Sequence, residues 1–264
     1  MSRNKNPKVS IIIVNFNNAK YLLKSLESAL SQTYKNKEII VIDDISDDNS
    51  LEILNKYKTK IKFYVNKTKT SFGSYNQINS YLKGVDKSTG RYICFLDSDD
   101  YFTKNKVNLV VRKFSEQTKI KTLFDIPIIK TNENLIKQKF VQKKLYFSSW
   151  PRFTPQSCIT IERGYANKIF KILKVKKFPS IWFDFRIAIL NFLSFGEIFI
   201  LNKHLTYYRQ LENSASKNYK TFSINWWYRR KEAHEFFSYL SKKLKIRDRI
   251  TLDKIITNIV NFFL

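Results

Sequence analysis

Four largely apolar segments, separated by segments with helical spacing, constrain the fold of this chain more than any other feature. The predicted strands are Val9–Val14, Glu38–Ile42, Ile61–Val65 and Arg91–Leu96. Helices are predicted between them because apolar residues recur there at intervals of three and four, as at Leu22, Leu26 and Leu30. Strands that alternate with helices in this way predict a three-layer α/β/α fold whose central sheet is mostly parallel.

Polar residues follow the carboxyl ends of three of these strands. Asn15 and Phe16 come after the first strand, Asp43 and Asp44 after the second, and Asp97–Asp100 after the fourth. The carboxyl ends of parallel strands meet at one edge of the sheet, where open α/β folds bind their ligands. We therefore expect these side chains to converge on a single crevice.

Asp97, Asp99 and Asp100 form a cluster of like charges at the end of the fourth strand. Carboxylates this close repel one another, and their pKa values rise unless a cation holds them ionised. Oxygen ligands suit a hard divalent ion, so the cluster predicts a site for Mg²⁺ or Mn²⁺ that bridges to phosphate oxygens. The alternative is a turn that caps the helix expected to begin near Lys104.

The rarity of glycine, histidine and cysteine excludes several classes of protein. The chain has five glycines, and neither G-x-G-x-x-G nor G-x-x-x-x-G-K-[ST] can be written with them. The usual dinucleotide-binding dehydrogenases and P-loop NTPases are therefore excluded, and a nucleotide would have to be held by carboxylates and a metal. His204 and His234 leave little room for a zinc site or a histidine-based triad. The two cysteines, Cys94 and Cys158, cannot build a disulfide framework.

A net charge of +26 requires an explanation. The functional alternative is an anionic partner, such as a membrane surface, a nucleic acid or an acidic substrate. The compositional alternative is that Lys is simply abundant, since basic residues recur in every segment. Two stretches have a larger excess of basic over acidic residues than the rest of the chain. Arg163–Lys177 has six basic residues and no acid, and Lys217–Lys254 has eleven basic residues and four acids.

Membrane-spanning and leader segments are not expected. A spanning helix needs ~20 apolar residues, whereas Ile187–Leu201 contains an Asn, a Gly and a Glu, and Ile255–Leu264 is too short. The residues before the first strand lack an apolar leader. The expected location is therefore the cytoplasm.

Several spaced motifs agree in order with one known family. They are an Asn-Phe-Asn after the first strand, Gln32-Thr33-Tyr34, an Asp-Asp-x-Ser after the second strand, and Gly90 leading to Leu-Asp-Ser-Asp-Asp. In these motifs the chain resembles the family 2 glycosyltransferases, which have the GT-A fold, closely over residues 8–115 and weakly to about 216. The resemblance implies a glycosyltransferase domain over residues 1–216, with a nucleotide-sugar half (8–115) and an acceptor half (116–216). A basic, aromatic helical extension would follow over 217–264.

The resemblance also implies roles for individual residues. Phe16 would stack on or flank the base, Asp44 would accept a hydrogen bond from a ring nitrogen, and Asp97 would reach the ribose. Asp99, together with Asp97, would ligate Mn²⁺ or Mg²⁺ on the diphosphate. Supporting roles are implied for Asp43 and Asp100. The nucleotide-sugar-binding residues implied in this way are Asn15, Phe16, Asp44, Asp97 and Arg209.

Asp184 occupies the place where the family has its catalytic base, usually written as an acidic pair, and here only one acid is present. The alternative is that Asp184 is the N-cap of the apolar helix Phe185–Leu193. Further on, the chain resembles the family's Tyr-Arg-x-His-x-x-Asn-x-Ser element, with Leu211 in place of a histidine that commonly helps to hold the metal or diphosphate. The matching residues are Tyr208, Arg209, Asn213 and Ser216.

Aromatic and apolar residues in the second half have more than one interpretation. Trp150 or Trp182 could stack on a sugar face or belong to the core. Trp226–Lys231 interleaves aromatic residues with positive charge, which favours Trp226 and Trp227 as interfacial anchors on an anionic membrane. A helical apolar stripe near the C-terminus is typical of a core, a dimer contact or a membrane face. It consists of Leu252, Ile255, Ile256, Ile259 and Phe263.

Together these features predict an inverting glycosyltransferase. It would transfer a sugar from a nucleotide-diphosphate donor, with UDP favoured, to a hydroxyl of a glycan or lipid-linked glycan in cell-surface polysaccharide biosynthesis. It would work at the inner face of the cytoplasmic membrane, and no specific nucleic acid partner is expected. The alternative is a non-catalytic binding protein that keeps the nucleotide fold and uses its basic surface to hold nucleic acid or another partner. A sugar nucleotidyltransferase is disfavoured because Asn15–Asn18 is neither glycine-rich nor basic.

Overall fold

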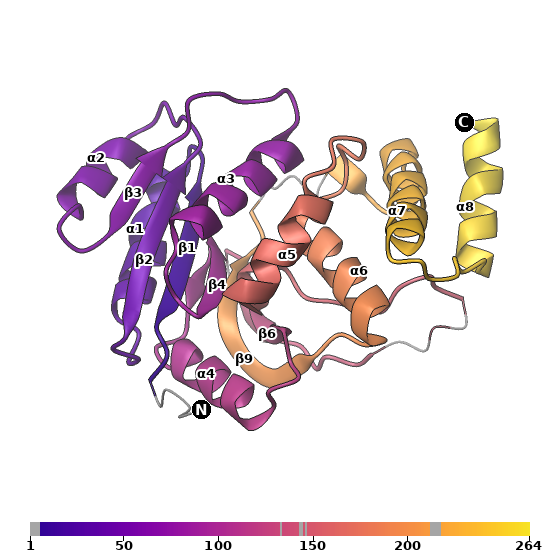
Figure 1. Cartoon of the computed structure of the whole chain (residues 1–264). Coiled ribbons are helices and arrows are strands. Elements are labelled where there is room, and N and C mark those ends of the chain that lie inside the picture. Colours follow the sequence, from indigo (N-terminus) through magenta and orange to yellow (C-terminus); the bar gives the residue numbers. More distant parts are fainter. Residues whose placement is uncertain (1–5, 133, 143–144, 146, 212–217) are drawn as a thin grey trace.

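A single mixed sheet with helices on both faces organises the chain (Figure 1). The computed structural model describes residues 6–132, 134–142, 145, 147–211 and 218–264. The strands are β1 (Val9–Asn15), β2 (Lys37–Asp43), β3 (Lys62–Val65), β4 (Tyr92–Asp97), β5 (Tyr101–Phe102), β6 (Thr122–Lys130), β7 (Leu135–Lys137), β8 (Ile159–Glu162) and β9 (Ile200–Arg209). The helices are α1 (Ala19–Leu30), α2 (Ser50–Lys56), α3 (Gly73–Lys87), α4 (Lys106–Glu116), α5 (Arg163–Leu173), α6 (Phe183–Phe195), α7 (Ile224–Lys243) and α8 (Leu252–Phe263), with a 3₁₀ turn at Gln156–Cys158.

The first half of the sheet is parallel, as the alternation of strands and helices predicts. The strand order is β3-β2-β1-β4-β8-β6-β9-β5, with β7 paired to β6, and the first four strands in this order run in one direction. Beyond β4 the sheet is mixed, because β8 runs antiparallel to both of its neighbours whereas β9 runs parallel to β6. The register sets Asn15 opposite Asp43, and Val14 opposite Asp97. The polar residues that end β1, β2 and β4 therefore share one edge.

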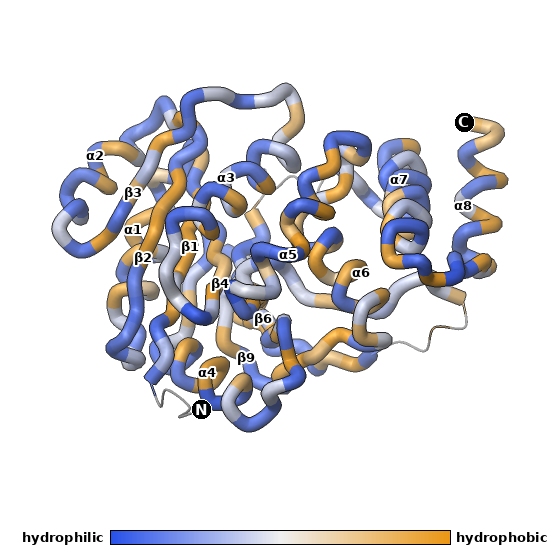
Figure 2. Tube along the Cα trace, viewed as in Figure 1, coloured by the Kyte–Doolittle hydropathy of each residue, from blue (hydrophilic) through white to orange (hydrophobic). Residues whose placement is uncertain are grey.

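Each face of the sheet is buried by its own set of helices. Alternate residues of a strand point to opposite faces, so Ile11 and Ile13 pack with α1, α2 and α4, while Ile12 and Val14 pack with α3, α5 and α6. Figure 2 shows the hydrophobic segments of the central strands between these helices. The predicted three-layer α/β/α arrangement is confirmed.

Beyond the sheet, α7 and α8 form an outer helical pair (Figure 1). The inner face of α7 joins the core around α6 through Phe236, Phe237 and Leu240, which are buried. The predicted apolar stripe of α8 is exposed instead: Ile259 is 54% and Phe263 80% exposed. Its interpretation as a core face is therefore wrong. None of the helices in the described residues is long and apolar enough to cross a bilayer.

Glu38 of β2 accepts hydrogen bonds from residues at the amino ends of β1 and β4. Its carboxylate accepts hydrogen bonds from Ser10 Oγ (2.7 Å), Lys8 Nζ (3.0 Å) and the backbone N–H of Thr89 (2.7 Å). Burial by itself favours the neutral acid, but these donors together lower the pKa of Glu38 to about 2. Gly90 allows this close packing, because a Cβ there would lie 2.5 Å from the backbone nitrogen of Ser10.

We predict that Glu38→Gln lowers the free energy of unfolding by about 2 kcal/mol at pH 7, since hydrogen bonds to a charged group are among the stronger ones. A folded pKa below the ordinary value of 4.5 stabilises the protein above that pH, and the stabilisation is lost as the pH falls toward 2. Urea unfolding at pH 7 and at pH 3 measures both effects. The exposed Glu27→Gln is the control, and an equal loss of stability at the two pH values would show that the charge of Glu38 is unimportant.

Candidate active site

A cavity of ≈ 700 Å³ opens at the carboxyl edge of β1, β2 and β4. Residues from both halves of the chain line it, including α6, β9 and the start of α7. Most of the residues predicted for the site converge here. Those in the lining are Phe16, Asp44, Asp97, Asp99, Asp184 and Arg209.

One end of the cavity combines an aromatic face with a buried acid. Phe16 is 49% exposed, and Lys69 Nζ lies 3.7 Å from its ring centroid. Asp44 is buried and accepts a hydrogen bond from Asn66 Nδ2 at 2.8 Å, and burial raises its pKa. Lys69 was not predicted, because one lysine in a lysine-rich loop gives no signal in the sequence. This end can hold a flat ring that offers an N–H group.

Asn15 lies behind the cavity and not in its lining. Its side chain is fully buried, and its Nδ2 donates to Asp43 Oδ2 (2.8 Å) and to Ser46 Oγ (3.2 Å). Asp43 in turn accepts from the hydroxyl and backbone N–H of Ser46. The side chain of Asn15 thus holds the loop after β2 through Asp43 and Ser46, and the nucleotide-sugar contact predicted for Asn15 stays a prediction.

The three acids after β4 form one cluster, with carboxylate oxygens within 4.8 Å of one another. Asp97 accepts hydrogen bonds from Tyr81 Oη (2.9 Å) and from Gln156 Nε2. Burial, followed by the charge of Asp99, raises the pKa of Asp97 to about 8. Burial also raises the pKa of Asp100, and one of its oxygens has no hydrogen-bond partner among the described residues. Without a nearby positive charge, the cluster therefore favours the protonated form of these acids.

These acids do not cap the next helix. Helix α4 begins at Lys106, and its N-cap is Asn105, so the capping alternative is wrong. A buried cluster that offers only oxygen ligands is instead suited to a hard divalent cation. Asp97 and Asp99 line the cavity, whereas Asp100 does not, which makes the first two the ligands that fit Mg²⁺ or Mn²⁺.

Asp184 faces the same cavity from the first turn of α6. The N-cap of α6 is Trp182, so Asp184 is not the N-cap, although its Oδ1 accepts from the backbone N–H of Phe185 at 2.7 Å. Burial raises the pKa of Asp184, and Arg229 opposes that rise. The charge of Asp184 also contributes to the raised pKa of Asp97, so the two carboxylates lie within electrostatic reach of each other.

Trp150 and Trp182, which the sequence left as either sugar-stacking or core residues, occupy different environments. Trp182 lines the cavity, next to Asp184. Trp150 packs edge-on against Phe185, with ring centroids 5.1 Å apart, and against His234 at 4.7 Å. Trp150 is therefore part of the packed interior, and Trp182 is the one that can meet a ligand.

Strand β9 brings Arg209 to the acid cluster, as the resemblance implies. Its Nε donates to the carbonyl of Asp99 (2.6 Å), and its backbone N–H donates to Asp100 Oδ1 (2.8 Å). The guanidinium also lies 4.9 Å from the ring centroid of Tyr21. Leu211 lines the cavity where the family's histidine is expected. The other two predicted members of this element, Asn213 and Ser216, lie outside the described residues.

A buried ion pair beneath the acid cluster was missed by the sequence analysis. Lys106 Nζ lies 2.8 Å from Asp125 Oδ2, and both side chains are fully buried. Lys106 also donates to the carbonyl of Ser157 (2.6 Å), whose hydroxyl accepts from the backbone N–H of Asp97 (3.0 Å). The available signal was the position of Lys106, since it shares the buried face of α4 with Val110.

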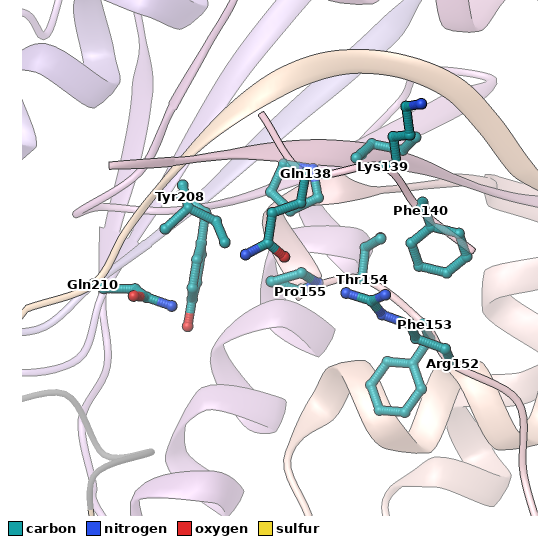
Figure 3. Close-up of a pocket in the computed structure, with 12 residues that line it drawn as sticks. Gln138, Lys139, Phe140, Arg152, Phe153, Thr154, Pro155, Tyr208 and Gln210 are labelled. Carbon is teal, nitrogen blue, oxygen red and sulfur yellow. The ribbon is translucent and has the colours of Figure 1, made fainter. Parts of the chain in front are cut away.

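A second cavity, of ≈ 170 Å³, adjoins the first (Figure 3). The two share Pro155 and Tyr208, and the second is built from β6, β9 and the segments 138–140 and 152–155. Figure 3 shows the polar ends of Gln138 and Gln210 facing the space beside Tyr208. The second half of the chain thus has a small, polar and aromatic pocket directly beside the main cavity.

Comparison with known proteins places these observations in a family. Residues 10–182 match the model of glycosyl transferase family 2. An uncharacterized glycosyltransferase from Nostoc sp. is 31% identical over 215 residues, which are 76% of this chain and 64% of that protein. The Escherichia coli UDP-Glc:alpha-D-GlcNAc-diphosphoundecaprenol beta-1,3-glucosyltransferase WfaP is 32% identical over 80% of each chain. The crystal structure of S. aureus TarS with UDP-GlcNAc has a TM-score of 0.62 at 18% identity, covering 87% of this chain and 66% of TarS 1-349.

We predict that Lys106→Met lowers the free energy of unfolding by about 3–5 kcal/mol, because it leaves Asp125 as an uncompensated buried charge. The double variant Lys106→Met/Asp125→Leu should recover most of that loss, since an apolar pair can replace a buried ion pair. Urea unfolding of the single and double variants measures the coupling, with the exposed Lys104→Met as the control. Strictly additive losses in the double variant would contradict the proposed pairing.

Proposed function

The chain belongs to glycosyl transferase family 2, and from this premise we propose that it transfers a sugar from a UDP-linked donor to a hydroxyl of a lipid-linked glycan, with inversion at the anomeric carbon. That it is a glycosyltransferase follows from the family. The observation that carries the finer proposal is the shared cavity. Asp44, Asp184, and Asp97 and Asp99 of the acid cluster all line this cavity.

The donor's base is assigned to the end of the cavity formed by Phe16, Asp44 and Lys69. Uracil has a ring N–H that can donate a hydrogen bond to the carboxylate of Asp44. Its flat face can pack on the exposed ring of Phe16. The ribose and diphosphate of a UDP-sugar are assigned to Asp97 and Asp99, which line the same cavity. The printed names of two similar proteins support the choice: WfaP uses UDP-Glc, and TarS was crystallised with UDP-GlcNAc.

Mn²⁺ or Mg²⁺ is proposed as the cofactor, held by Asp99 and Asp97. When bound, such an ion supplies positive charge that stabilises the departing diphosphate. The protein adds cationic side chains of its own, because Arg209 and Arg229 also line the cavity. These two arginines can take on part of the electrostatic role of the histidine that Leu211 replaces.

Asp184 is proposed as the catalytic base. The acceptor's hydroxyl oxygen would form a bond to the anomeric carbon, while the bond from that carbon to the diphosphate oxygen breaks on the opposite face. The hydroxyl proton would pass to Asp184, whose raised pKa makes it a better proton acceptor than an ordinary aspartate. Arg229 would favour the ionised form that the reaction needs at its start.

The acceptor is assigned to the acceptor-half side of the cavity and to the pocket beside it (Figure 3). The name of WfaP describes an acceptor attached to diphosphoundecaprenol, which supports a lipid-linked acceptor for this chain as well. An enzyme with such a substrate in cell-surface polysaccharide synthesis would work at the inner face of the cytoplasmic membrane. The net charge of +26 is compatible with an anionic leaflet.

We predict that Asp184→Asn reduces kcat by ~10²- to 10⁴-fold, the usual contribution of a positioned general base. Affinity for UDP with Mn²⁺ should stay within about twofold of wild type, because the base acts on the acceptor's proton and not on the nucleotide. Steady-state kinetics and calorimetric UDP titration measure the two quantities. The exposed Asp86→Asn is the matched control, and parallel losses of turnover and UDP affinity would exclude Asp184 as the base.

We predict that Asp99→Asn removes the metal-dependent part of UDP affinity, because one ligand of the cation is lost. UDP titration with and without Mn²⁺ should give an enhancement in wild type and in Asp86→Asn, but none in Asp99→Asn. An unchanged enhancement would place the metal elsewhere.

The alternative of a non-catalytic binding protein is tested with the wild-type chain. Hydrolysis or transfer should be detectable with at least one member of a panel of UDP- and other nucleotide-sugars in the presence of Mn²⁺. If none is turned over, and oligonucleotides bind at physiological salt, the binding-protein alternative is correct.

A further inference from the structure

Helix α8 packs on the protein with its polar face and turns its apolar face outward. Surface helices of globular proteins normally do the reverse, with the apolar stripe against the core. In Figure 1, α8 is the outermost element on its side of the molecule, beside α7. This reversed orientation indicates that the outward face has an apolar partner.

Polar contacts hold α8 to α7. Arg230 Nε donates to Asp253 Oδ1 at 2.7 Å, and the Nδ2 of Asn261 donates to the carbonyl of Trp227 at 3.1 Å. Thr257, between them on the same face, is fully buried. Burial alone would raise the pKa of Asp253, but hydrogen bonds from His234 and Arg230 lower it. The face of α8 that meets α7 is thus polar, and side-chain hydrogen bonds join the two helices.

The opposite face of α8 exposes large apolar side chains. Phe262 is 82% and Phe263 80% exposed. Single exposed hydrophobic residues are normal on a protein surface, but a contiguous stripe of them is not. Ile250, in the segment before α8, is 81% exposed and extends the surface toward the end of α7. The exposed apolar residues of α8 are Leu252, Ile255, Ile256, Ile259, Phe262 and Phe263.

Exposed positive charge lies beside this stripe. The segment that joins α7 to α8 alternates apolar and basic residues, with Ile246 and Ile250 exposed among them. A second copy of the chain would bring the same patch against itself in a two-fold dimer, so these positive charges would oppose one another. An anionic leaflet would neutralise them. The exposed basic residues are Lys242, Lys243, Lys245, Arg247 and Arg249.

We propose that α8 lies in the interface of an anionic membrane leaflet. Its apolar face is buried among the lipid chains, and the basic segment before it contacts the headgroups. This differs from the anchor predicted from the sequence, since Trp226 and Trp227 are only partly exposed and pack on each other with ring centroids 4.7 Å apart. The membrane-binding element is therefore assigned to α8 and not to the tryptophan pair.

The position of α8 also relates the membrane to the active site. Arg229 of α7 lines the main cavity, and the next residue, Arg230, holds Asp253 of α8. One turn of α7 therefore connects the cavity wall to the lipid-facing helix, which would bring the cavity close to a lipid-linked acceptor. This step rests on the proposed function, whereas the attachment of α8 to lipid does not.

The test is flotation of the 264-residue protein with vesicles of phosphatidylcholine alone or with about 30% phosphatidylglycerol, at low salt. Wild type should float with the anionic vesicles. The triple variant Ile256→Ser/Ile259→Ser/Phe263→Ser should show at least a roughly tenfold lower partition coefficient, because less apolar surface enters the lipid. The control Leu23→Ser/Val65→Ser removes exposed apolar side chains far from α8 and should float like wild type.

A charge variant separates the contribution of the basic residues from that of the apolar stripe. Lys245→Glu/Arg247→Glu should remove the preference for anionic over neutral vesicles while keeping UDP binding, which also shows that the variant is folded. Failure of wild type to float with anionic vesicles, or flotation of the triple variant like wild type, would overturn the proposal. So would a wild-type dimer that the triple variant converts to a monomer without any change in flotation. Because flotation needs no substrate, its failure is distinguishable from failure of the proposed transfer reaction.

Discussion

The burial of three carboxylates at the end of β4 is the constraint on which the rest of the site depends. Burial raises the pKa values of Asp97 and Asp100, and the like charges of their neighbours raise them further. The protein compensates only in part. Tyr81 and Gln156 donate to Asp97, and Arg209 contacts the backbone of Asp99, yet an oxygen of Asp100 stays without a partner among the described residues. The ionised form of the cluster therefore needs a positive partner, and a divalent cation is the one proposed.

The acceptor half is needed to complete that site, and the sheet topology shows how it does so. Strand β5 follows the acid cluster directly and pairs with β9, which carries Arg209 back to the same edge. Lys106, at the start of α4, contacts Asp125 of β6, Ser157 before β8 and Thr206 of β9. One buried side chain therefore links three later segments. The side of the cavity formed by β1, β2 and β4 can be built from consecutive β-α units. The side that carries Asp184 and Arg209 depends on contacts between residues far apart in the chain.

This difference explains what the sequence could predict. The parallel half was predictable because strand and helix periodicity are local, and because a strand's carboxyl end fixes the edge at which its next residues lie. It does not fix which of those side chains line the cavity: Phe16 does, whereas Asn15 is buried behind it. Lys106 was missed although it shares the buried face of α4 with Val110, because lysines are usually exposed and the chain has 48 Lys and Arg residues. Strand β8 and helix α5 were missed as well, since short strands in a mixed sheet are determined by their distant neighbours.

Helix α8 is a second example of a structural feature that the sequence alone cannot predict. The sequence reveals that one face is apolar, but it does not reveal which face meets the protein. Tertiary contacts decide this, because Arg230 of α7 donates to Asp253 and Asn261 donates to the carbonyl of Trp227, and the stripe is then left outside. Since charge-assisted hydrogen bonds hold α8 in place, the helix can form in water before any lipid is present. Attachment to a membrane would then require no folding transition, and the free energy gained by burying the stripe would go into binding.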